Sequence, residues 1–362
     1  MPDRNPRLLV LGQLNHIHVI HMSYALAERG FDVVIAGQSR EGFGEIPEPE
    51  HGVRLIELPS ASGRTLRGIA SQIRAVRKVI REVKPDIVQA HWLCGYAAFA
   101  AIAGARPLVS MAWGSDVLRA NRAQRIANRI ALRRSVLAVG DSQGLCDAME
   151  ALGAAPSMIA NITWGVDIDR FSPATDRAAV RSQLGLPEGP LVLSPRSLLP
   201  VYNPDVVLKA FGLVADRVPD AQFVMLSLYD GAHDLGPLPH PDRMHIVGHV
   251  PYERMPDYLR AAEVSVSIPS SDGSPRSVWE AMACGSAVVL SDLPWLRGEV
   301  DPTSEAVVVP IDAEAVADAV VGLLEDPDRA ATMSANARAL AVQRRDVRVE
   351  MDRLASLIHD AV

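Results

Sequence analysis

The sequence predicts an α/β protein with two doubly wound parallel sheets. Short apolar runs of strand length alternate with segments of helical spacing, which is the pattern of consecutive βαβ units. This pattern stops in a stretch rich in Gly, Pro and Asp at residues 165–173 and restarts at Pro190. A chain of 362 residues is long enough for two domains, each with its own core.

The first half reads as alternating strands and helices. The spacing of apolar residues predicts helices at 18–29, which ends at Gly30, and at 69–83, which ends before Pro85. Buried parallel strands are predicted at 8–12, 31–36, 87–90, 107–111 and 136–139.

The second half repeats this organisation. A helix is predicted at 204–214, another around Glu280, and a helical tail at the end of the chain. Strands are predicted at 190–194, 222–226, 245–247, 264–267, 287–290 and 306–309. In such sheets, ligands bind at the carboxyl ends of the strands.

Composition excludes several classes of protein. The longest apolar runs fall far short of the roughly 20 residues of a membrane span, and the first residues lack the pattern of a signal peptide. Cys94, Cys146 and Cys284 are unclustered, so neither a disulfide framework nor a zinc site is indicated. A net charge of −7 argues against a general nucleic-acid binder. The cytoplasm is therefore the default expectation.

The segment from Ser271 to Gly285 is the most informative part of the chain. Asp272 and Gly273 are typical turn residues, Ser274 can cap a helix, Pro275 suits the first helical position, and Gly285 can end the helix. Such a helix start leaves free N–H groups, here expected at Arg276, Ser277 and Val278, and the helix dipole favours an anion in front of them.

Two carboxylates, Asp272 and Glu280, lie eight residues apart on either side of this anion position. They could bind the hydroxyls of a sugar attached to the anion. Arg276 opposes the helix dipole unless an anion is bound. The alternative is an N-capped core helix whose Glu280 faces solvent.

This layout resembles the E-x7-E signature of the retaining glycosyltransferases of family 4, and the run from Glu280 to Gly285, EAMACG, is close to the family wording. The first acid is Asp272 here, where the family usually has Glu. The resemblance implies the GT-B fold, in which two Rossmann-like domains face a central cleft. It also implies that Glu280 holds the nucleotide ribose and that Asp272 contacts the transferred sugar.

The resemblance covers most of the chain. Its landmarks include Lys84-Pro85-Asp86 with His91, Trp113-Gly114-Ser115-Asp116, the linker from Trp164 to Pro173, Ser194-Pro195-Arg196, and Val247-Gly248-His249-Val250. It implies an acceptor-side domain at 1–168, rejoined by a C-terminal helix at 347–362. The nucleotide-sugar-binding domain is expected at 169–346.

On this basis we assign candidate site residues. The catalytic candidates are Asp272, Arg196 and His91. The donor-binding candidates are Glu280, Arg276, Ser277, Val278, Tyr202, Gly12, Gln13, Gly248 and Val250, with Arg196 on the diphosphate. The acceptor-side candidates are His18, Trp113 and Asp116.

Each assignment has a plainer alternative. Arg196 could be a surface ion-pair partner, and His91 or His18 a satisfied core histidine. Asp116 could be a first-turn helix acid, and Tyr202 a packing residue.

The chain departs from the family pattern at four places. Tyr202 stands where a phosphate-binding Lys is usual, Trp113 stands where a His is frequent, and Gly12-Gln13 replaces a glycine pair. A further glycine pair is missing at residues 226–231. These changes leave the reaction class intact and leave donor identity open.

The sequence thus predicts a retaining glycosyltransferase that moves a sugar from a nucleoside-diphosphate sugar to a glycan, lipid or small metabolite. The resemblance implies that no metal or other cofactor is needed. The alternatives are a non-transferase of the same fold, such as a sugar-nucleotide epimerase, and a nucleotide-sugar-binding protein without turnover.

One basic segment has no place in this assignment. From Arg119 to Arg134 there are six arginines and no acid, and four of them lie near one helical face. Such a helix can lie on anionic lipid, which would allow a peripheral contact at the inner face of a membrane, or can receive an anionic acceptor. The alternative is an ordinary solvated helix face.

Overall fold

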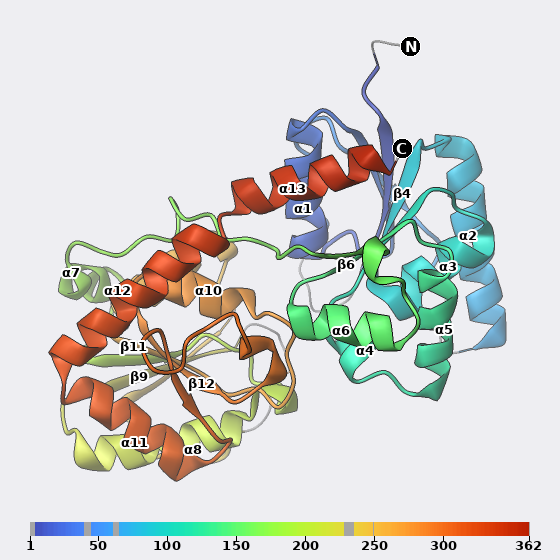
Figure 1. Cartoon of the computed structure of the whole chain (residues 1–362). Helices are drawn as coiled ribbons and strands as arrows, with labels where there is room; N and C mark the ends of the chain where they lie inside the picture. Colours follow the sequence, from blue (N-terminus) through green and yellow to red (C-terminus); the bar gives the residue numbers. More distant parts are fainter. Residues whose placement is uncertain (1–3, 40–44, 61–64, 228–234, 249, 362) are drawn as a thin grey trace. The chain divides into compact units, whose positions relative to one another are not determined.

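The computed structural model describes residues 4–39, 45–60, 65–227, 235–248 and 250–361. Residues 228–231 and His249, which belong to the predicted landmarks, lie outside the described residues. The chain forms two compact units (Figure 1). Unit 1 comprises Met1–Trp164 and Arg348–Val362, and unit 2 comprises Gly165–Val347.

Unit 1 contains a parallel sheet of seven strands in the order β3-β2-β1-β4-β5-β6-β7. The strands are β1 (Arg7–Leu11), β2 (Asp32–Gly37), β3 (Arg54–Glu57), β4 (Ile87–His91), β5 (Leu108–Met111), β6 (Leu137–Gly140) and β7 (Ile159–Asn161). The sequence predicts five of these. The two others, β3 and β7, are short edge strands with no fully buried residue, so they lack the apolar run that marks an inner strand.

The helices of unit 1 connect these strands. They are α1 (Ile17–Glu28), α2 (Leu66–Val83), the π-helical η1 (Trp92–Ala97), α3 (Ala98–Ala103), α4 (Ser115–Leu118), α5 (Arg122–Leu132), α6 (Gln143–Ala151), the 3₁₀ turn η2 (Pro156–Met158) and α13 (Val347–Asp360). Helices α2, α3, α5 and α6 share one buried cluster with the sheet, which includes Val76, Ala101, Leu132 and Leu145.

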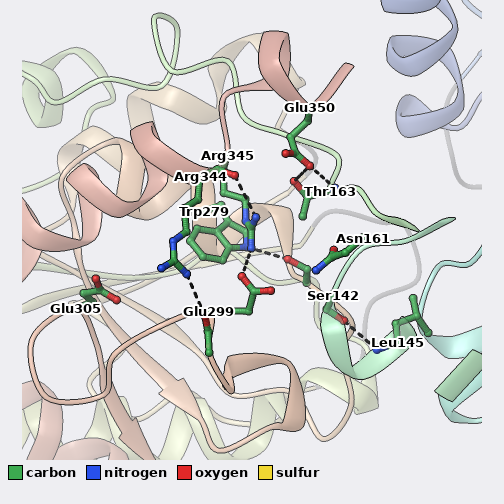
Figure 2. A network of polar contacts seen from close by, with 12 residues as sticks. Ser142, Leu145, Asn161, Thr163, Trp279, Glu299, Glu305, Arg344, Arg345 and Glu350 are labelled. Atoms are coloured by element: carbon green, nitrogen blue, oxygen red, sulfur yellow. Dashed lines mark hydrogen bonds and ion pairs between the residues drawn. The ribbon is translucent and has the colours of Figure 1, made fainter. Parts of the chain in front are cut away.

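Helix α13 is fixed to unit 1 by polar contacts, of which those to Thr163 are buried. The Glu350 carboxylate accepts hydrogen bonds from the Thr163 N–H at 2.6 Å and the Thr163 hydroxyl at 3.0 Å (Figure 2). Arg353 pairs with the same carboxylate at 2.8 Å, and Asp352 pairs with Arg29 at 2.7 Å. Glu350 is 3% exposed, so its partners are needed to offset the loss of hydration.

Unit 2 contains a parallel sheet of six strands in the order β10-β9-β8-β11-β12-β13. The strands are β8 (Leu191–Ser194), β9 (Gln222–Leu226), β10 (Met244–Val247), β11 (Val264–Ser267), β12 (Ala287–Ser291) and β13 (Val307–Val309). All six are predicted from the sequence within one residue, because each is a short, mostly apolar run.

Helices cover both faces of this sheet (Figure 1). Helices α8 (Pro204–Arg217) and α11 (Ala313–Leu324) pack on one face, and α9 (Met255–Ala261), α10 (Arg276–Ala283) and α12 (Pro327–Arg344) pack on the other. The remaining elements are α7 (Arg177–Gln183) and the 3₁₀ turns η3 (Pro200–Tyr202), η4 (Tyr252–Arg254) and η5 (Pro294–Leu296).

The chain enters and leaves unit 2 at adjacent points. The Val166 N–H donates to the Arg345 carbonyl at 2.6 Å, and the Val347 N–H donates to the Val166 carbonyl at 3.0 Å. Gly165 has φ +67°, and a Cβ there would lie 2.4 Å from the Val347 Cα. Only glycine therefore fits at this crossing.

Arg345 connects this crossing to α10. Its guanidinium pairs with Glu299 and lies over the Trp279 ring, 4.4 Å from the centroid (Figure 2). The Trp279 indole N–H in turn donates to the Ser274 hydroxyl at 2.9 Å. Helix α10 and the loop before it are therefore held on their buried side by packing and hydrogen bonds.

Candidate active site

The strand order of unit 2 brings two predicted site residues together. The order reverses between β8 and β11, and open α/β sheets bind ligands at the carboxyl ends of the strands at such a point. Arg196 follows β8 by two residues, and Asp272 follows β11 by five. Their side chains meet at this edge of the sheet.

Arg196 is fixed by three neighbours. Its Nη2 atom lies 2.6 Å from the Asp272 Oδ2, its Nη1 donates to the Ser277 hydroxyl at 2.9 Å, and its guanidinium lies 4.2 Å from the centroid of the Tyr202 ring. Burial lowers the pKa of Arg196, but the Asp272 carboxylate and Tyr202 together more than offset this, so the pKa is raised. The Arg196 side chain is only 11% exposed, which makes it a fixed cation at the start of α10 rather than a surface residue.

The helix start differs from the prediction in three details. Ser274 is not the cap, because its hydroxyl accepts from Trp279. Pro275 is not the first helical residue, because its backbone is extended and it occupies the cap position, without a side-chain cap. The Val278 N–H is not free, because the first turn is tightened and this group donates to the Pro275 carbonyl at 3.0 Å. Gly285 ends the helix with φ +74°, as predicted.

Glu280 does not face solvent, since it is 3% exposed. Its Oε1 atom lies 2.9 Å from the Arg276 Nε and accepts from the Tyr252 hydroxyl at 2.9 Å. Arg276 also donates to the Tyr252 hydroxyl oxygen. Burial raises the pKa of Glu280, and the Arg276 charge opposes that shift. The ribose-binding candidate is therefore a buried carboxylate with a cation beside it.

Tyr252 is a further candidate site residue, which the sequence does not reveal. It begins η4, and its ring lies below the guanidiniums of Arg276 and Arg170, at 4.9 and 5.5 Å from the centroid. Burial and the nearby Glu280 raise its pKa, so the phenol stays protonated and donates. A tyrosine after a proline is ordinary in a sequence, and only the fold shows its partner.

The two donor-binding candidates after β10 differ from each other in exposure. Val250 is 6% exposed and belongs to the buried cluster that contains Leu226 and Val278. Gly248 is exposed, and a Cβ there would have no heavy atom within 4 Å.

In unit 1 the strand order reverses between β1 and β4, which are neighbours in the sheet. Gly12 and Gln13 follow β1, and His91 is the last residue of β4. A Cβ on Gly12 would lie 3.0 Å from both γ carbons of Val19, and one on Gly37 would lie 1.6 Å from the Gly12 carbonyl oxygen. The backbone is therefore tightly packed here. The Oε1 atom of Gln13 is buried and has no hydrogen-bond partner among the described residues.

His91 has the contacts of a satisfied core histidine. It is fully buried, and its Nδ1 accepts from the Trp113 indole N–H at 3.1 Å. An indole can only donate, so Nδ1 carries no proton and the proton of the neutral ring lies on Nε2, 3.2 Å from the Gln89 amide group. This N–H is satisfied when the amide presents its oxygen to the ring, since an amide nitrogen can only donate. Burial, helped by His16, lowers the pKa of His91 to about 3. These contacts favour the plainer alternative over a proton-transfer role.

Aromatic side chains gather around Trp113. Its ring centroid lies 4.3 Å from that of His16 and 5.1 Å from that of Trp164, and His18 stacks on Trp164 at 4.8 Å. These four side chains are only partly buried. Trp113 therefore occupies the centre of a partly exposed aromatic surface, which we call the aromatic platform: His16, His18, Trp113 and Trp164.

Asp116 supports the loops beneath this platform. Its carboxylate accepts from the backbone N–H groups of Leu93 at 2.8 Å and Trp113 at 2.9 Å. Burial raises its pKa to about 6, although these N–H groups oppose the shift. This geometry agrees with the helix-acid alternative rather than with direct contact to a ligand.

Neither a metal site nor a membrane span is found in the part of the chain that the structure describes. Within the described ranges, no three His, Cys, Asp or Glu side chains are grouped so as to hold a metal ion. None of the helices in those ranges combines the length and apolar character needed to span a bilayer.

Comparisons with known proteins agree with this architecture. Residues 176–340 match the family described as glycosyl transferases group 1, and residues 7–138 match the glycosyl transferase 4-like family. The chain is 30% identical to the D-inositol 3-phosphate glycosyltransferase of Xylanimonas cellulosilytica, over 90% of this chain and 86% of that protein. The chain belongs to glycosyltransferase family 4.

Other proteins are similar to this glycosyltransferase over most of their length. It is 27% identical to a GDP-mannose-dependent monoacylated alpha-(1-6)-phosphatidylinositol monomannoside mannosyltransferase of Corynebacterium glutamicum, over 73% of this chain and 74% of that one. The structure of Anabaena HepE in complex with UDP-glucose superposes with a TM-score of 0.83 at 20% identity, over 98% of this chain and 100% of that one. The predicted GT-B fold is confirmed.

Proposed function

We propose that this glycosyltransferase moves a sugar from a nucleoside-diphosphate sugar to an acceptor with retention of the anomeric configuration, and that unit 2 binds the donor. The observation that carries the proposal is the Arg196 guanidinium, held between Asp272 and Ser277 at the start of α10. A preorganised cation at a helix start stabilises the charge that grows on a departing diphosphate. Retention rests on the resemblance to family 4.

The second acid needs a change of partner to bind ribose. Glu280 is paired with Arg276 and Tyr252 in the structure. We propose that the ribose hydroxyls replace Arg276 at the carboxylate while Tyr252 keeps it in position. Arg276, once released, would turn to the diphosphate and supply the second cation that Tyr202 cannot. This exchange would also relieve the unfavourable position of a cation at a helix N-terminus.

The similar proteins bind or depend on sugar nucleotides with different bases, so they do not identify the base of this enzyme's donor. Anabaena HepE forms a complex with UDP-glucose, whereas the Corynebacterium enzyme depends on GDP-mannose. We propose that the base lies against the backbone of Gly248 and Val250, because Gly248 is exposed and leaves open space. The remaining donor candidates divide by role: Asp272 would contact the sugar hydroxyls, and Ser277 and Val278 would lie beside the phosphates.

We propose that unit 1 binds the acceptor through the aromatic platform. Partly exposed rings suit the apolar face of a sugar or a cyclic polyol, and the buried Gln13 Oε1 could accept from a hydroxyl. His18 and Trp113 would touch the acceptor. His91 and Asp116 would act as positioning residues, because both hold Trp113 and neither is exposed.

Two experiments test this function. A thermal-shift screen with UDP, GDP, dTDP and ADP identifies the nucleotide, since a ligand that binds only the folded state stabilises it. NMR of the product made from the matching donor then gives the anomeric configuration. Inversion of configuration would refute the retaining mechanism.

The reaction should also proceed in EDTA, because the proposed anion clamp is built from guanidiniums and a helix start. Loss of turnover on chelation, restored by Mg²⁺ or Mn²⁺, would refute the metal-free mechanism. The matched control is a parallel reaction with EDTA already saturated by Mg²⁺. The epimerase and non-turnover alternatives are not favoured, because the relatives described above are glycosyltransferases.

A further inference from the structure

The strongest feature outside the site is the charge distribution of unit 1. Residues 66–140 carry thirteen Lys and Arg against three Asp and Glu, a balance of +10 in a chain whose net charge is −7. The rest of the chain therefore carries −17. Such a segregation of charge produces a strong local positive potential, which acts on partners of opposite charge.

The positive charges are concentrated on one set of helices. Helix α3 packs against both α2 and α5, so the three helices form a continuous layer on unit 1 (Figure 1). Six of the thirteen cations lie on α5 and the segments beside it: Arg119, Arg122, Arg125, Arg129, Arg133 and Arg134. All six are exposed, and among the described residues none is ion-paired with a carboxylate.

Helix α5 also exposes apolar side chains between these arginines. Asn128, Ala131 and Leu132 form its buried side. On the opposite side, Ile126 is 58% exposed and Ile130, one turn later, is 37% exposed. Leu118, just before the helix, is 41% exposed. We call this surface, made of the six arginines with Leu118, Ile126 and Ile130, the basic α5 face.

An apolar stripe bordered by arginines is the arrangement of a helix that lies in a membrane interface. The isoleucines can enter the acyl boundary while the guanidiniums bind lipid phosphates. Three of the six cations lie on a helix of 11 residues, about 16 Å long, and the other three lie beyond its ends, so the set is too widely spread for one small anion. Nucleic acid would be expected to use exposed aromatic side chains for stacking, whereas the exposed centre of this face is isoleucine.

We propose that the basic α5 face docks unit 1 onto an anionic lipid bilayer. The lipid chemistry required is a surface rich in negatively charged phosphate headgroups. This docking does not depend on the donor or acceptor of the transfer reaction. Its consequence is that the acceptor-side unit would be held at a membrane surface without a spanning helix.

The test is co-sedimentation of the whole protein with vesicles. We expect binding to phosphatidylcholine vesicles that contain about one third phosphatidylglycerol, and little binding to phosphatidylcholine alone. Each arginine near an anionic surface contributes about fivefold to the partition coefficient, so the triple variant Arg122→Glu/Arg125→Glu/Arg129→Glu should bind at least about 100-fold more weakly. Binding should also weaken as salt is raised.

A matched control keeps the change in net charge constant. The variant Arg254→Glu/Arg297→Glu/Arg329→Glu places the same reversals on exposed positions of unit 2 and should bind like the wild type. The double variant Ile126→Ser/Ile130→Ser tests the apolar part and should weaken binding while keeping all six arginines. Thermal unfolding shows whether each variant is folded.

Several outcomes would overturn the proposal. It fails if the wild type does not bind the anionic vesicles at low salt, or binds neutral ones equally well. It also fails if both triple variants lose binding to the same extent. If the wild type binds single-stranded RNA and does not bind vesicles, the basic α5 face is a nucleic-acid-binding surface instead.

Discussion

Replacement of Arg196 should reduce both donor affinity and turnover. In the structure its guanidinium makes contacts at 2.6 Å to Asp272 and 2.9 Å to Ser277, and its position between them suits a bidentate grip on phosphate oxygens. A hydrogen bond to a charged group contributes about 1.5–3 kcal/mol. Two such bonds give about 3–6 kcal/mol, so Arg196→Ala should lower kcat/KM by about 10²- to 10⁴-fold.

Three companion variants separate the effect of charge from that of geometry. Arg196→Lys keeps the charge and loses the fork, so about half of that free energy should be lost. Tyr202→Phe keeps the ring that covers Arg196 at 4.2 Å and removes only a neutral hydroxyl, so its effect should be about 1 kcal/mol or less. Tyr202→Lys restores the usual second cation and should tighten binding of the nucleoside diphosphate.

The assay is steady-state kinetics with one donor, together with calorimetry on the nucleoside diphosphate alone. Because charge grows on the leaving group in the transition state, Arg196→Ala should lower kcat and not only raise KM. Thermal unfolding of each variant excludes a folding defect. If Arg196→Ala is as active as the wild type and Tyr202→Phe is inactive, the phosphate site lies elsewhere.

Three further predictions follow from particular contacts. Glu280→Ala should leave the protein folded but weaken nucleoside-diphosphate binding at least about tenfold, because it removes the proposed ribose acceptor. Calorimetry measures this affinity, and an unchanged value would make Glu280 a purely structural residue. His91 has a pKa lowered to about 3 by burial, so the native state binds fewer protons than the unfolded chain below about pH 6.5. Its contribution should therefore reduce stability by about 1.4 kcal/mol per pH unit as the pH falls from about 6.5 toward 3, and His91→Gln should remove that slope in thermal unfolding at several pH values. An identical slope in the two proteins would contradict a buried neutral ring. Gly165→Ala should lower the melting temperature more than the control Gly30→Ala. Both glycines have positive φ, but only at Gly165 would the new Cβ clash, at 2.4 Å from the Val347 Cα. Equal shifts in melting temperature would show that the backbone at this crossing can relax.

The inner strands and the helix that carries Glu280 could be predicted because local patterns determine them. A buried parallel strand must be apolar throughout, and the turn, acid and glycine signals around Asp272 and Glu280 are contiguous in sequence. The edge strands β3 and β7 could not be predicted, since half-exposed residues carry no such pattern.

The partners of the site residues depend on tertiary structure. Tyr252, in the turn after β10, reaches Glu280 on α10 across 28 positions. Trp113 reaches His91 across 22 positions, because β4 and β5 are neighbours in the folded sheet. Ser274 looked like a helix cap because its position in the sequence suits one, but the indole of Trp279 takes its hydroxyl instead. Local propensity gives the type of residue at a site, and packing decides what that residue binds.

The adjacent crossings at Val166 and Val347 have a consequence for how the protein is made. Unit 2 is one uninterrupted segment, whereas unit 1 needs α13, which follows unit 2 in the chain. During synthesis the second unit is therefore complete before the first, and the buried Glu350 reaches Thr163 only after the whole of unit 2 has been translated. Because the two ends of unit 2 meet, this segment could be exchanged as a block between family members through one pair of neighbouring junctions. If unit 2 binds the donor as proposed, such an exchange should change donor preference while unit 1 stays the same.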